Sequence, residues 1–263
     1  MTSWWIRVCT VFFGAVLIWL GDGFVATLVF GEGYSLAGHV FRAVTTGALV
    51  ALMLLLVLRR WPADVGFRPS GWALRRAGLG ATAYVVAFSI GGAVILWLSL
   101  ANLSVDGPSL LPQALAVLAL VLMFEAIPEE LIFRGYLFAA LRERLPVWAT
   151  ILLQAVMFCL FGAIIGAARD LERLLLFFTF SIALGIIRHV TGTVYATIGF
   201  HAAFQLLTQL INGEQWTSVV LDDPELWFRD IAFFLMPLVV APLGIALFAR
   251  ARRRPEAVPR SGS

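Results

Sequence analysis

Eight long apolar segments constrain the fold of this 263-residue chain more than any other feature. At a rise of about 1.5 Å per helical residue, each is long enough to cross the ~30 Å of hydrocarbon in a bilayer. Because a chain in lipid must satisfy its backbone hydrogen bonds internally, we predict an all-α membrane protein, a bundle of about eight transmembrane helices. The segments are 8–30, 40–58, 79–101, 110–141 (interrupted), 147–166, 173–189, 193–212 and 228–249.

The composition supports the membrane class. Hydrophobic residues make up 61% of the chain and charged residues only 13%, whereas about a quarter of a typical soluble domain is charged. The basic residues are all arginine and fall in short loops, so we expect a lipid bilayer and no nucleic acid as a partner. The first segment lacks a small-x-small cleavage site before Gly31, so we expect a retained helix within a single polytopic domain, 1–263.

The distribution of arginines predicts the orientation in the membrane. If all eight segments cross, 14 arginines fall on the face that carries both termini, mainly in the loop 59–78 and the arginine-rich tail 250–263. Four fall on the other face, which also carries the acidic segment 213–227. By the positive-inside rule, we expect a multi-pass protein of the cytoplasmic membrane with both termini in the cytoplasm. The four arginines of the other face are Arg42, Arg169, Arg173 and Arg229.

The fourth segment carries charges at a depth where hydrocarbon is expected. The stretch EAIPEELIFRG places Glu125, Glu129, Glu130 and Arg134 between LPQALAVLALVLMF and YLFAAL. An ionisable group at membrane depth costs about 3 kcal/mol and is usually paired and functional. Glu130 precedes Arg134 by four residues, the favourable order for a helical ion pair. A purely structural ion pair would account for these two residues but leaves Glu129 without a purpose, so we interpret the stretch as a functional site.

A second polar pair lies in the seventh segment, in the stretch GFHAAFQ. His201 and Gln205 are four residues apart and therefore face the same direction on a helix. A lone membrane histidine is often a packing residue, but the glutamine one turn away and the glutamates elsewhere favour a site. Cys9 and Cys159 lie in separate apolar runs, which excludes a disulfide framework and a cysteine zinc site.

Two motifs carry a resemblance to a known family. The stretch EELIFRG resembles the E-E-x-x-x-R motif of the CPBP (ABI) family, which includes type II CAAX prenyl endopeptidases and bacteriocin-processing proteins. The stretch RHVTGTVYATIGFHAAFQ is similar to the short turn and H-A-x-x-N helix of that family. The resemblance covers about 110–212 and implies a protease core there. It implies intramembrane cleavage near the C-terminus of a lipidated or leader-bearing peptide, so that the partner is a peptide or a prenylated protein.

The resemblance also implies roles for individual residues. Glu129 matches the carboxylate that activates the hydrolytic water, and Glu130 and Arg134 match the pair that supports it. His201 matches the histidine on the oxyanion side, and Gln205 stands where the family has asparagine. Together these five residues form the predicted catalytic set.

Two positions depart from the family pattern. The F-x-x-x-H motif has become F-x-x-x-G between Phe158 and Gly162, which removes the partner of the water-activating carboxylate and predicts a void one side chain wide. Gln205 keeps the amide of the family's asparagine and lengthens its reach by one methylene. Zinc normally takes three protein ligands, whereas the chain offers Glu129 and His201, with Glu125 as a third candidate. That donor set argues against a divalent metal such as zinc as cofactor.

Three functions fit these features. The leading interpretation is a CAAX-type intramembrane endopeptidase, a hydrolase whose activity is weakened by Gly162. The alternative is a non-catalytic membrane interaction protein that uses the same bundle to bind a peptide, a lipid or a partner helix; the void expected at Gly162 motivates this alternative. A proton-coupled carrier would also use intramembrane charges, but the chain shows no internal repeat of the kind that transporters often carry.

Overall fold

The computed structural model describes residues 4–31, 35–57, 65–67, 71–212 and 219–252. Within these ranges eight helices are long and apolar enough to cross a membrane, which confirms the predicted all-α bundle. Residues 58–64, 68–70 and 253–263, with much of the arginine-rich loop and tail, lie outside the described residues. The spans are Trp4–Phe30, Leu36–Leu55, Ala73–Trp97, Gly107–Arg142, Val147–Ile164, Leu171–Thr191, Val194–Ile211 and Arg229–Leu247.

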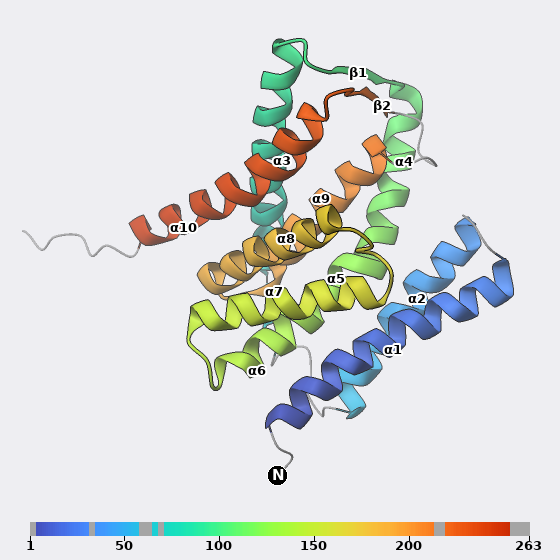
Figure 1. Cartoon of the computed structure of the whole chain (residues 1–263), viewed down its shortest axis with the longest axis vertical. Coiled ribbons are helices and arrows are strands. Elements are labelled where there is room, and N and C mark those ends of the chain that lie inside the picture. The colour runs from blue at the N-terminus through green and yellow to red at the C-terminus, as the bar shows by residue number, and fades with distance from the viewer. Residues whose placement is uncertain (1–3, 32–34, 58–64, 68–70, 213–218, 253–263) are drawn as a thin grey trace, which may run out of the picture.

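Five spans are single helices, and the second, fourth and eighth spans contain π-helical segments, labelled η. Figure 1 shows how the helices are arranged. The elements outside the fourth span are α1 (Trp4–Phe30), α2 (Leu36–Leu52), η1 (Met53–Val57), α3 (Ala73–Trp97), α7 (Val147–Ile164), α8 (Leu171–Thr191), α9 (Val194–Asn212), η4 (Arg229–Val240) and α10 (Ala241–Arg252). Two short strands, β1 (Asn102–Val105) and β2 (Val219–Asp222), were not predicted from the sequence. They pair antiparallel, so part of the acidic segment 213–227 is joined to the connection after α3.

Consecutive spans run in opposite directions, so the connections fall on two faces (Figure 1). We call the face with the start of α1, the segment 65–67 and the connection 143–146 the terminal face. We call the face with β1, β2 and the connection 165–170 the far face. In Figure 1 the N-terminus and the β1–β2 pair lie at opposite ends of the bundle.

The fourth span stays helical through its charged centre but changes its winding there. Its elements in order are α4 (Gly107–Val121), η2 (Leu122–Ala126), α5 (Ile127–Glu130), η3 (Leu131–Leu137) and α6 (Phe138–Arg142). Pro128, which has no backbone N–H to donate, is the second residue of α5. The predicted interruption is therefore a pair of π-helical segments on either side of Glu129 and Glu130. Such turns are frequent at functional sites.

Helices α3 and α9 pack with their backbones in close approach. A Cβ atom on Gly80 would overlap the carbonyl oxygen of Ala196, and one on Gly199 would overlap the carbonyl oxygen of Ala77. Small residues allow membrane helices to approach in this way. The contact fixes α9 in the bundle two residues before His201.

We expect Gly80→Ala to lower the free energy of unfolding by about 1–3 kcal/mol, because the added methyl group meets backbone that cannot rotate away. Gly78→Ala is the matched control, since it lies on the same helix and a Cβ atom added there would meet no atom within 4 Å. Thermal unfolding in one detergent compares the two variants. Identical melting temperatures would contradict the close packing of α3 against α9.

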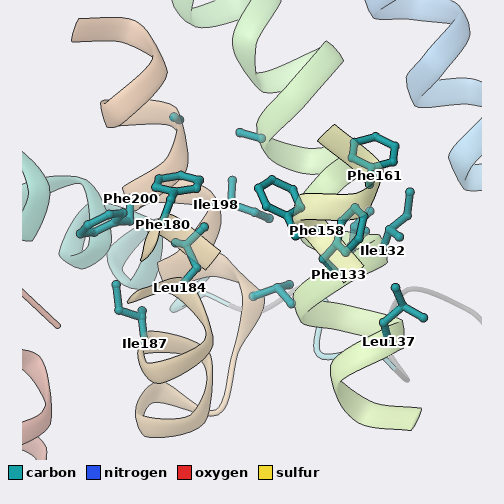
Figure 2. Close-up of a cluster of buried hydrophobic side chains, with 14 of the residues drawn as sticks. Ile132, Phe133, Leu137, Phe158, Phe161, Phe180, Leu184, Ile187, Ile198 and Phe200 are labelled. Atoms are coloured by element: carbon teal, nitrogen blue, oxygen red, sulfur yellow. The ribbon is translucent and has the colours of Figure 1, made fainter. Parts of the chain in front are cut away.

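Aromatic side chains from four elements, η3, α7, α8 and α9, pack in the core of the bundle (Figure 2). The rings of Phe133 in η3 and Phe158 in α7 lie 4.9 Å apart, centroid to centroid. Phe180 in α8 lies 6.4 Å from Phe200 in α9 on the same measure. This core brings the fourth span and α9 together, although their motifs lie far apart in the chain.

Candidate active site

Glu130 and Arg134 form the ion pair expected from their spacing. Arg134 Nη1 lies 3.0 Å from Glu130 Oε1, and both side chains are completely buried. The guanidinium carbon also lies 4.6 Å from the centroid of the Phe158 ring, so the cation is held over an aromatic face. The pair is therefore a fixed part of the interior.

His201 on α9 meets both glutamates of the fourth span. Its Nδ1 lies 3.0 Å from Glu130 Oε1, and its Nε2 lies 4.0 Å from Glu129 Oε2. Because the Glu130 carboxylate already accepts a hydrogen bond from Arg134 and can only accept, we assign the ring hydrogen of His201 to Nδ1. In the neutral ring, Nε2 then presents a lone pair towards Glu129.

The five residues of the predicted catalytic set divide into two layers. Glu129, His201 and Gln205 line a cavity of about 290 Å³ inside the bundle. Glu130 and Arg134 lie behind this wall, where Glu130 contacts the histidine directly. The sequence predicted the two motifs separately, and the structure brings them into contact.

Glu125 lines the same cavity, one helical turn before Glu129. Its Oε2 atom is buried and has no hydrogen-bond partner among the residues that the structure describes. The wall of the cavity therefore combines two carboxylates and an imidazole with aromatic rings, among them Phe158 and Phe177. Such a mixture of apolar surface and a few convergent polar groups is typical of a ligand site.

The prediction of a void at Gly162 is wrong. A Cβ atom on Gly162 would lie only 2.5 Å from a ring carbon of Phe177 on α8. The Phe177 ring is stacked on Phe158, with centroids 5.1 Å apart, and fills the space that a larger residue would need. The non-catalytic alternative thereby loses the observation that motivated it. No pattern in the sequence singles out Phe177, which belongs to an apolar run.

Because Phe177 fills this space, the single substitution Gly162→His should destabilise the fold. We expect Gly162→His to lower the free energy of unfolding by about 1–3 kcal/mol through overpacking against Phe177. Combining it with Phe177→Ala should recover part of this loss, because the ring that obstructs the new side chain is removed. Melting curves of both single variants and the double variant decide the point. A Gly162→His protein that melts with the wild type would contradict the filled site.

The donor set does not fit a metal centre. Within the described ranges, no group of three or more histidine, cysteine, aspartate or glutamate side chains is placed to hold a metal ion. Zinc sites normally use three protein ligands; Glu125, the third candidate, lines the same cavity as Glu129 and His201 but does not form a metal-binding group with them.

Comparison with known proteins identifies the same part of the chain. Residues 111–207 match the family described as "Rce1-like: Type II CAAX prenyl endopeptidase Rce1-like". No curated protein and no solved structure gives a significant match. The matched stretch contains both motifs and all five residues of the predicted catalytic set. Residues 111–207 of this multi-pass membrane protein are therefore similar to the Rce1-like type II CAAX prenyl endopeptidases.

Proposed function

We propose that the protein hydrolyses a peptide bond near the C-terminus of a lipidated or leader-bearing peptide, with Glu129 and His201 activating the water. One observation carries this proposal. Glu129 Oε2 and His201 Nε2 lie 4.0 Å apart on the wall of a cavity within the bundle. Two proton acceptors that converge on one point, away from bulk water, are suited to general-base catalysis.

The water loses its proton to this pair of acceptors. As its oxygen bonds to the carbonyl carbon of the substrate, the proton passes to Glu129 or to Nε2 of His201. Glu130 accepts the hydrogen bond from Nδ1 and so orients the ring, as a third group does in other nucleophile–base systems. In this arrangement His201 takes over the water-activating part of the histidine that Gly162 replaces.

The oxyanion that forms on the substrate needs a donor. The side-chain amide of Gln205 lines the same cavity and can donate N–H groups, whereas neutral His201 presents an acceptor there. We therefore assign to Gln205 the role of hydrogen-bond donor to the oxyanion. When the carbon–nitrogen bond breaks, the proton held by Glu129 and His201 passes to the leaving amine, and the products are a carboxylic acid and an amine.

Purified protein in detergent, incubated with a prenylated C-terminal peptide and with a leader-bearing peptide, tests the proposal. We expect two fragments whose masses add up to substrate plus one water. Gln205→Ala should lower kcat by roughly 10²–10³-fold, the cost of one oxyanion donor, and Gln205→Asn should retain most of the activity. Failure of the folded protein to cleave either peptide would refute the proposal.

A further inference from the structure

The site is closed on its terminal-face side. Gly135 packs directly on the segment 65–67, since a Cβ atom on it would lie 3.0 Å from Cβ of Val65. Val65 is 2% exposed. Arg188 Nε donates to the carbonyl oxygen of Arg134 at 2.8 Å. The layer beneath the ion pair is therefore filled by protein on the face that carries the N-terminus.

The cavity extends in the opposite direction. Its lining includes Gly166 and Ala167 in the connection between α7 and α8, and Thr208, which lies on α9 beyond Gln205 towards the far face. A second cavity of about 180 Å³ shares Arg173 and Thr208 with the first and continues towards η4. Both cavities thus lie on the far-face side of Glu129 and His201.

Arginines mark the far-face end of the cavity. Arg173, in the first turn of α8, is exposed and lines both cavities. Its guanidinium has no ion pair among the described residues. Arg42, by contrast, pairs with Asp22 at 3.4 Å, and Arg229 pairs with Glu172 at 3.0 Å. A ligand in the cavity would meet carboxylates at the deep end and an available cation at the outer end.

We propose that the substrate reaches the site from the far face and that Arg173 binds the terminal carboxylate of the segment that follows the scissile bond. The position of the scissile bond rests on the proposed function, whereas the route into the cavity does not. By the positive-inside rule, the arginine distribution predicts that the far face lies outside the cytoplasm. The favoured substrate is then a leader-bearing peptide on the outer side, rather than a lipidated protein attached to the cytoplasmic leaflet.

The route can be tested without any assay of cleavage. Cys9→Ser and Cys159→Ala remove the native thiols, and Thr208→Cys then introduces a single thiol in the cavity. Arg144→Cys is the control, an exposed position in the connection 143–146 on the terminal face. We expect a membrane-impermeant maleimide to label Thr208→Cys in intact cells and Arg144→Cys only in inverted vesicles. The proposed route is overturned if both thiols are labelled from the same side of the membrane. It is also overturned if Thr208→Cys is labelled only in inverted vesicles, or is not labelled at all.

The carboxylate site is tested by binding to the Glu129→Gln protein, which leaves the peptide uncleaved if the proposed function holds. A fluorescent peptide with a free C-terminus should bind at least tenfold more tightly than its C-terminal amide. Arg173→Gln should abolish this difference. Arg169→Gln should preserve it, because Arg169 is exposed on the same face but does not line the cavity. Equal binding of acid and amide, or a difference that disappears when the protein is placed in anionic lipid, overturns the assignment.

Discussion

Arg134→Ala is expected to lower the free energy of unfolding by about 3–5 kcal/mol, the typical cost of removing one member of a buried ion pair. Arg134 and Glu130 are both completely buried and 3.0 Å apart. Without the guanidinium, the Glu130 carboxylate keeps the hydrogen bond from His201 but loses its balancing charge. The Phe158 ring also loses the cation that lies over it. Glu129→Ala should cost less, because Glu129 borders the cavity.

A double substitution separates the contribution of the buried charge to stability from the contribution of side-chain packing. Glu130→Gln with Arg134→Met leaves no uncompensated charge, and the new amide oxygen can still accept from His201 Nδ1. Replacing a buried ion pair by neutral groups of similar volume costs little or even stabilises, so we expect the double variant to recover part of the loss. Melting curves in a single detergent compare the variants. If Arg134→Ala melts with the wild type, the guanidinium is not a structural partner of Glu130.

Glu129→Gln is expected to lower the rate of peptide cleavage by roughly 10²–10⁴-fold, the usual contribution of a general base. The amide has nearly the same shape as the carboxylate but cannot take the proton of the attacking water. The melting temperature should change little, because the 4.0 Å separation from His201 Nε2 is longer than a hydrogen bond. Glu143→Gln is the control, an exposed glutamate on the terminal face whose replacement should leave cleavage at the wild-type rate.

The fold could be predicted from the sequence because its signals are local. Each membrane span is a long, predominantly apolar stretch of sequence, and the described residues contain eight such helices. The ion pair between Glu130 and Arg134 could also be predicted from the sequence, because the spacing along one helix determines which side chains meet. The match at 111–207 confirms the resemblance that the two motifs carry.

The contacts between helices could not be predicted in the same way. No period or motif specifies that His201 binds Glu130 more closely than Glu129, because this depends on how α9 is rotated against the fourth span. The Phe177 ring at Gly162 and the segment 65–67 beneath Gly135 are also packing outcomes between distant parts of the chain. The short pairing of β1 with β2 involves residues more than a hundred positions apart, which no local pattern encodes.

Single-turnover cleavage in ¹⁸O-labelled water, with the wild type and Glu129→Gln at matched folded concentration, tests the central claim most directly. The claim is that Glu129, with His201 beside it, activates a water for attack on a peptide bond. The wild type should produce two fragments, with one ¹⁸O atom in the new carboxylate, and the Glu129→Gln protein should leave the peptide intact over the same time. Fragments released at the same rate by both proteins would contradict the claim.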